Sequence, residues 1–132
     1  PTCLFILLNP STADEVENDP TVDRCERRAR QMGFGGLVVC NLFAFRATSP
    51  KVMKKQKDPI GPENDAKISR VAAQAGIVIC GWGEDGQHLS RSKTVLASLR
   101  MSKIPLNYLR LNKSGEPRHP LYISYKQQPQ PW

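Results

Sequence analysis

The stretch "CLFILLNPSTAD" (residues 3–14) decides the expected fold, because a run of apolar residues ends abruptly at an Asn-Pro pair. An apolar run without polar alternation is typical of a strand that is covered on both faces of a sheet. Proline cannot donate to the ladder of a sheet, so the strand should end at Asn9-Pro10. Small polar residues follow at once, and the corner that they form is a first candidate for a functional site.

Three further apolar runs occur along the chain: "GLVVCNLF" (36–43), "GIVICGW" (76–82) and "PLNYLRL" (105–111). Patterns typical of helices lie between the runs, over 18–33, 61–76 and 89–102. Strands that alternate with helices pair in parallel through right-handed crossovers. We therefore predict a three-layer α/β/α sandwich around a four-stranded parallel sheet, with buried strands at 3–8, 37–42 and 77–82.

A chain of 132 residues fits one domain with a hydrophobic core, spanning 1–132. We expect residues 44–62 to form a long connection and residues 125–132 to form a loose tail. The chain begins at Pro1 rather than Met, so we also expect N-terminal residues to be missing. No apolar run reaches membrane-spanning length and no signal peptide is visible, which predicts a protein without membrane association.

Lysine and arginine outnumber the acidic residues by 19 to 12, giving a net charge of +7. This balance favours a polyanionic partner such as DNA or a nucleotide, with plain solubility as the alternative. The four cysteines form no C-x-x-C pair, so we interpret them as buried thiols rather than zinc ligands, and their spacing gives an iron-sulfur cluster little support. We expect a cytoplasmic monomer that uses no metal or cofactor.

Polar segments follow each of the four predicted strands: "NPSTAD", "NLFAFR", "GWGEDG" and "RHPLYIS". Ligands of parallel α/β sheets bind beyond the carboxyl ends of the strands. We therefore expect these four segments to form one site at that edge.

Two asparagines stand at the ends of predicted strands. Asn9, held by Pro10, could orient a water molecule, or it could cap its own backbone in an Asx turn. Ser11 and Thr12 could bind an anion or form a solvated turn. Asn41 interrupts an apolar strand, and its amide could read the edge of a nucleobase or bridge to a neighbouring loop.

His119 lies between Arg118 and Pro120, and a rigidly held imidazole there could donate to an oxyanion or move protons. We expect the other histidine, His88, to be an exposed surface residue. Aromatic side chains near this edge could stack on a base, although we expect Trp82 to pack beneath its loop; they are Phe43, Phe45, Trp82 and Tyr122. Four lysines could contact phosphates or form a solvated face; they are Lys51, Lys54, Lys55 and Lys57.

The motifs "LLNPSTAD", "DPT", "GLVVCNLFAFRAT", "GPEND", "GWG" and "GEPRHPLYI" resemble an uncharacterised bacterial and phage family, domain of unknown function 1643. This resemblance runs over about residues 4–124 and implies no function by itself.

A more distant resemblance is to the uracil-DNA glycosylase superfamily. Asn9-Pro10 is similar to the first-strand motif of its mismatch-specific branch, and Asn41 stands where the superfamily reads a flipped pyrimidine. Trp82-Gly83 resembles the end of its third strand, and His119-Pro120 its His-Pro loop. The chain departs from the uracil-specific branch by lacking Asp at position 9 and the Ser-rich loop, and it has no clear equivalent of the aromatic residue that stacks on uracil.

The resemblance implies a DNA glycosylase that hydrolyses the N-glycosidic bond of an unusual, mismatched or modified pyrimidine after extruding the base. Asn9 would position the water, with Asp14 as the reserve general base, Asn41 would read the base, and His119 would stabilise the leaving base. Further substrate contacts are expected from Pro10, Ser11, Thr12, Phe43, Arg46, Gly83, Arg118, and Leu121 or Tyr122 as the wedge. Two alternatives remain: a non-catalytic module that binds a modified base or nucleotide, and an enzyme of free nucleosides or nucleotides.

Overall fold

The computed structural model describes residues 1–10 and 19–132, and its centre is a mostly parallel sheet of five strands among those residues. The spatial order is β2-β1-β3-β4-β5, so the first strand lies inside the sheet. Strands β1 to β4 are parallel, and β5 pairs with β4 in the antiparallel sense. The strands are β1 (Thr2–Leu7), β2 (Gly36–Asn41), β3 (Ile77–Cys80), β4 (Asn107–Tyr108) and β5 (Gln130–Pro131).

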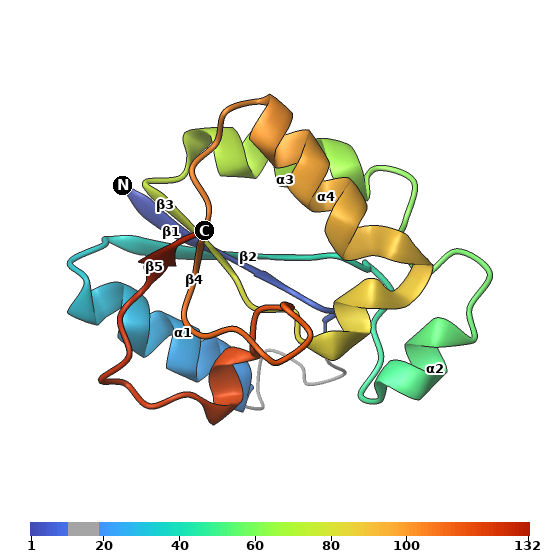
Figure 1. The fold of residues 1–132 in the computed structure, drawn as a ribbon, viewed down its shortest axis with the longest axis horizontal. Coiled ribbons are helices and arrows are strands. Elements are labelled where there is room, and N and C mark those ends of the chain that lie inside the picture. The colour runs from blue at the N-terminus through green and yellow to red at the C-terminus, as the bar shows by residue number, and fades with distance from the viewer. Residues whose placement is uncertain (11–18) are drawn as a thin grey trace.

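Helices cover both faces of the sheet, which confirms the predicted α/β layering (Figure 1). Helix α1 (Pro20–Gln31) packs on one face, and α3 (Asn64–Gln74) and α4 (Arg91–Met101) pack on the other. Alternation along β1 supplies both cores: Cys3, Phe5 and Leu7 face α1, whereas Leu4, Ile6 and Leu8 face α3 and α4. Two short helical segments, at Glu84–Ser90 and Pro120–Tyr122, and the helix α2 (Pro50–Lys54) lie in the connections.

Helix α1 begins with a side-chain cap, within the range 18–33 where a helical pattern was found. The Asp19 carboxylate accepts a hydrogen bond from the Thr21 main-chain N–H at 2.9 Å, and Pro20 occupies the first helical position. The helix ends before Gly33, whose φ of 85° suits glycine.

The sheet differs from the prediction in its number of strands and in the strands nearest the C-terminus of the chain. Only Asn107–Tyr108 of the expected run 105–111 pairs with β3, because the chain after it turns back on itself and Leu111 bridges to Pro117. A fifth strand, Gln130–Pro131, completes that edge.

The tail over 125–132, expected to be loose, is packed against the domain. The Trp132 N–H donates to the Leu106 carbonyl at 2.9 Å, and the indole lies 6.1 Å from the ring of Trp82 and 5.9 Å from that of Tyr108. The guanidinium of Arg100 also lies over the Trp132 ring. Sequence patterns underestimate such a tail, because one aromatic anchor at its end, rather than periodicity, orders it.

All four cysteines are buried free thiols, as predicted. Burial raises the pKa of the Cys3 and Cys25 thiols to about 12, so these groups stay protonated and pack as small apolar side chains. Within the described ranges, no helix is both long and apolar enough to cross a membrane.

We expect Trp132→Ala to lower the free energy of unfolding by about 1–3 kcal/mol, because a half-buried indole that anchors β5 is removed. Urea unfolding gives the value. Met101→Ala, at a side chain that is 85% exposed on the neighbouring helix, should change it by less than about 0.5 kcal/mol. Equal stability of the Trp132→Ala variant and the parent protein would mean that the tail is loose after all.

Candidate functional site at the carboxyl edge of the sheet

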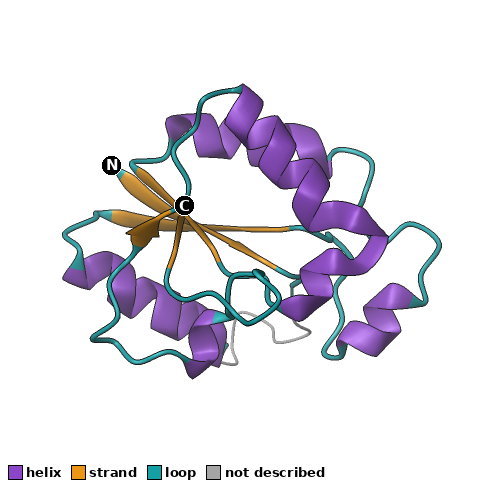
Figure 2. Ribbon diagram, in the orientation of Figure 1, coloured by secondary structure: helices purple, strands orange, loops and turns teal. Residues whose placement is uncertain are grey.

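The carboxyl ends of β1, β2 and β3 pass into loops at one edge of the sheet, away from the N-terminus (Figure 2). Leu7 at the end of β1 pairs with Asn41 of β2, and on its other side the Gly81 N–H donates to the Ile6 carbonyl at 2.9 Å. Neighbouring strands lie roughly 4.8 Å apart, so Asn41 and Gly81 are on the order of 10 Å apart across β1.

Asn41 presents its carboxamide on the α1 face of the sheet, because Val39 packs with the α1 cluster and side chains alternate along a strand. Its main-chain carbonyl accepts a hydrogen bond from Asn64 Nδ2 at 2.8 Å. Within residues 1–10 and 19–132, the carboxamide of Asn41 has no hydrogen-bond partner of its own. The main chain of Asn41 thus forms the bridge to the neighbouring loop, while the half-buried amide remains able to contact a ligand.

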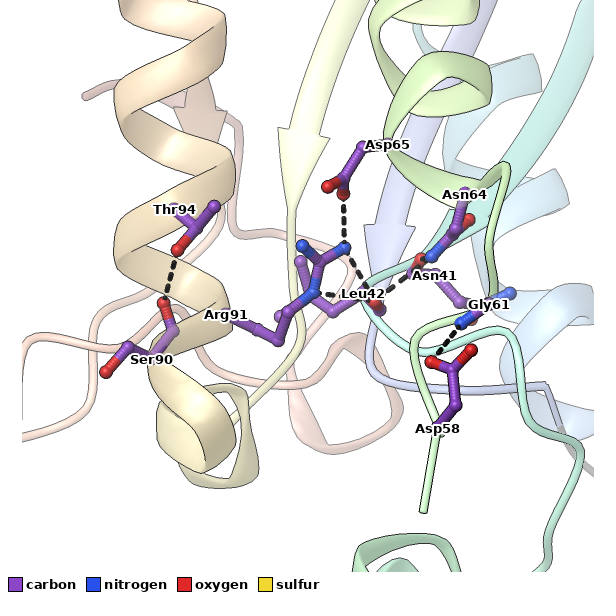
Figure 3. Close-up of polar contacts among 9 residues, drawn as sticks. All are labelled: Asn41, Leu42, Asp58, Gly61, Asn64, Asp65, Ser90, Arg91 and Thr94. Atoms are coloured by element: carbon purple, nitrogen blue, oxygen red, sulfur yellow. Dashed lines mark hydrogen bonds and ion pairs between the residues drawn. The ribbon is translucent and has the colours of Figure 1, made fainter. Parts of the chain in front are cut away.

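The next carbonyl, that of Leu42, accepts hydrogen bonds from two helices (Figure 3). Asn64 Nδ2 lies 3.1 Å from it, and Arg91 Nε and Nη2 lie 3.0 and 2.9 Å from it. Arg91 is only 2% exposed, and its Nη2 also forms an ion pair with Asp65 at 2.8 Å. These contacts fix the main chain directly after Asn41, where β2 ends.

A tight turn places Asn64 for this role. The Asp58 carboxylate accepts from the Gly61 N–H at 3.1 Å, and Gly61 has a φ of 90° (Figure 3). A Cβ on Gly61 would lie 3.0 Å from the Ala44 side chain, so both the conformation and the close approach favour glycine. Sequence reasoning missed Asn64 and Arg91, because each stands among ordinary polar residues at a helix start.

The side chain of Asn9 ties two loops together, which neither of the roles predicted for it describes. Its Nδ2 donates to the carbonyls of Ala47 at 2.9 Å and Pro10 at 3.2 Å, with Phe45 at 3.5 Å. The Ala47 N–H in turn donates to the Pro10 carbonyl at 3.0 Å. With the nitrogen engaged in this way, the oxygen Oδ1 is the atom of Asn9 that could accept a hydrogen bond from water.

His119 is half-buried, and its Nδ1 accepts a hydrogen bond from the Leu121 N–H at 3.3 Å. A ring nitrogen that accepts carries no proton, so the neutral ring has its proton on Nε2. Burial lowers the pKa of His119, although the nearby Asp19 carboxylate opposes this shift. Near neutral pH, His119 is therefore a neutral donor through Nε2–H.

Close packing holds the His119 loop against the end of β3. A Cβ on Gly81 would lie 3.0 Å from the Pro120 ring, so only glycine lets the loop approach this closely. On its other side, Arg24 donates to the carbonyls of Pro120 and Ile123. Asn9-Pro10 after β1, the loops after β2 and β3, and the His119 loop thus lie at the same end of the sheet.

The remaining predicted residues differ in their access to a ligand. Phe43 is fully buried beside the His88 ring, so it belongs to the core and presents no ring to a base, and His88 is half-buried rather than exposed. Trp82 packs beneath its loop, as predicted, and donates to Glu116. Several predicted residues stay accessible at the edge: Arg46, Gly83, Arg118, Leu121 and Tyr122. Ser11, Thr12 and Asp14 lie outside the described residues.

In the part of the chain that the structure describes, no group of three or more His, Cys, Asp or Glu side chains could hold a metal ion. Lys54 forms an ion pair with Asp85, whereas Lys51, Lys55 and Lys57 are exposed.

The chain matches the family described as "Protein of unknown function (DUF1643)" over residues 1–121, and it belongs to this family. No curated protein and no solved structure matches the chain.

We expect Arg91→Lys to lower the free energy of unfolding by about 2–4 kcal/mol, because an ammonium cannot reproduce the two hydrogen bonds of the guanidinium to one buried carbonyl. Asp65→Asn tests the ion pair alone, and it should cost less than about 1 kcal/mol since the Asp65 side chain is 65% exposed. Urea unfolding of both variants decides the matter. Equal losses of stability in the two variants would show that Arg91 stabilises the fold through its ion pair with Asp65 rather than through the Leu42 carbonyl.

Proposed function

We propose that the protein is a DNA glycosylase-like hydrolase that cleaves the N-glycosidic bond of an unusual, mismatched or modified pyrimidine. Two polar groups at the same edge of the sheet support this function. His119 is a neutral donor through Nε2–H, and the Asn41 amide has no partner among the described residues. The donor suits a base carbonyl, and the amide can both donate to and accept from a base edge. The net charge of +7 suits a DNA backbone.

The reaction divides the work among three side chains. The oxygen of a water molecule bonds to C1′ of the sugar while the bond from C1′ to the base nitrogen breaks, and the bonding pair leaves on the base. Negative charge then develops on the base carbonyl, where His119 Nε2–H donates a hydrogen bond. The departing base takes up a proton, and the attacking water loses one to solvent.

Asn9 would act on the water. Its amide nitrogen is held by the loop carbonyls at Pro10 and Ala47, so Oδ1 has a fixed direction in which to accept from a water hydrogen. Fixed dipoles of this kind need no reorganisation during the reaction. Asp14 stays the reserve general base, at a position outside the described residues.

One observation favours a second candidate, a module that binds a modified base or nucleotide without cleaving it. The Asn9 amide donates hydrogen bonds to the loop carbonyls of Phe45 and Ala47. This structural role alone explains an Asn at position 9, without any part in catalysis. Turnover on DNA distinguishes these two functions. Turnover on free nucleosides but not on DNA would indicate the third, an enzyme of free nucleosides.

The test is a cleavage screen of oligonucleotides that carry uracil, mismatched thymine or hypermodified pyrimidines, with alkaline treatment to reveal abasic sites. With a cleaved substrate, His119→Ala should lower kcat about 10²–10³-fold with little change in KM, because the charge that it meets appears only as the bond breaks. Asn41→Ala should weaken binding as well, by about 1–3 kcal/mol, since its contact exists before and during cleavage.

His88→Asn, at the only other histidine, serves as the control and should retain parental turnover. Parental turnover in His119→Ala would refute the role of His119. Tight binding of a modified duplex without any abasic product would refute the hydrolase and support the binding module. Release of base from free nucleosides but not from DNA would assign the third class.

A further inference from the structure

Three arginines of α1 gather around one tyrosine of the C-terminal segment. Arg24, Arg27 and Arg28 stand at spacings that place them on one face of the helix. Their guanidinium carbons lie 4.3, 4.1 and 5.1 Å from the centre of the Tyr125 ring. Cation–π attraction holds the three charges in place despite their mutual repulsion.

Two of these arginines use their N–H groups inside the protein. Arg24 donates to the carbonyls of Pro120 and Ile123, and Arg28, which is only 4% exposed, donates to those of Ile123, Ser124 and Gln127. They fasten the segment that follows His119 to α1. The charge near that segment is therefore positive, and it is fixed.

The third arginine faces outward. Arg27 is exposed, and its guanidinium makes no hydrogen bond to the protein within the described ranges. Lys126 follows Tyr125 in the chain and is exposed. Its main-chain N–H donates to the Ser124 hydroxyl, and its ammonium has no partner among the described residues. Of the two acidic side chains on α1, Glu26 pairs with Arg30, and Asp23, one turn before Arg27, makes no ion pair among the described residues. Arg27 and Lys126 thus carry charge that a ligand could neutralise.

An exposed aromatic ring lies beside His119, four residues before Lys126 in the chain. Tyr122 is 74% exposed, and its ring centre lies 6.4 Å from that of His119. Exposed aromatic rings beside cations are how proteins hold nucleic-acid strands, with stacking on bases and charge on phosphates. An acidic protein surface would use the cations but has no need of the ring.

We propose that Arg27, Lys126 and Tyr122 form a strip that binds a DNA strand beside the extruded base: Arg27 and Lys126 contact phosphates, and Tyr122 stacks on a neighbouring base. This inference rests on the proposed function, because it takes the base to enter next to His119. The strip differs from the lysines of 51–57, which belong to the connection after β2.

The test is the salt dependence of binding to a short, unmodified, fluorescein-labelled DNA, as a duplex and as a single strand, measured by fluorescence anisotropy. The slope of log K against log[salt] should fall by roughly 0.9 for each phosphate that a variant no longer neutralises on the duplex, and by roughly 0.7 on the single strand. We expect the double variant Arg27→Gln/Lys126→Gln to leave two phosphates without their cations. Tyr122→Ala should weaken single-strand binding at every salt concentration without changing the slope.

Two controls separate specific charge from net charge. Arg70→Gln removes an exposed cation from α3 on the opposite face of the sheet, and it should leave the slope unchanged. Arg27→Lys keeps the charge and should keep the parental slope. An unchanged slope in the double variant, or an equally reduced slope in Arg70→Gln, would overturn the strip, as would a parent protein that binds neither DNA at low salt.

The outcomes also distinguish the strip from the proposed function. A slope that falls in the double variant, in a protein that never releases a base, would uphold the strip and refute the hydrolase. Base release that depends on His119, together with an unchanged slope in the double variant, would uphold the hydrolase and refute the strip.

Discussion

The main-chain carbonyl of Leu42 is the point on which the carboxyl edge of the sheet depends. It accepts hydrogen bonds from Asn64 of α3 and from two nitrogens of Arg91 of α4, so two helices converge on the single peptide where β2 ends. Arg91 is buried, and a buried guanidinium is tolerated only while its donors are satisfied. The exit of β2, the start of α3 and the start of α4 are therefore fixed together, and a change at any one of them disturbs all three.

The same principle recurs around the edge. Asn9 ties the loop after β1 to the carbonyl of Ala47, and Arg24 ties the loop after His119 to α1. In each case a side-chain donor satisfies main-chain carbonyls that have left the sheet, which a buried loop requires. Asn9 and the segment from Pro120 to Ile123 are therefore held by hydrogen bonds within the protein itself. Segments held in this way lose little conformational freedom when a ligand binds.

The layered fold was predictable because it follows from local signals. Apolar runs such as residues 3–8 mark strands buried on both faces, and Asp19-Pro20 marks the start of α1. The antiparallel fifth strand was not predictable, since Gln130 and Pro131 are poor strand formers and are ordered by the neighbouring Trp132. The prediction that Asn41 and His119 lie at one edge rests on the expected strand order alone. The tie made by Asn9 and the carbonyl contacts of Arg91 depend on long-range geometry that no sequence spacing reveals.

A role for His119 in stabilising a departing base requires that it present a neutral Nε2–H at this edge. Nitrogen-15 NMR of the imidazole, followed through a pH titration with His88→Asn protein to leave a single histidine, tests it most directly. Burial favours the uncharged ring, so we predict a pKa below the ordinary value of about 6.5 and, at neutral pH, the tautomer protonated at Nε2. A ring that is protonated on both nitrogens at neutral pH, or one that carries its single proton on Nδ1, would contradict this role for His119.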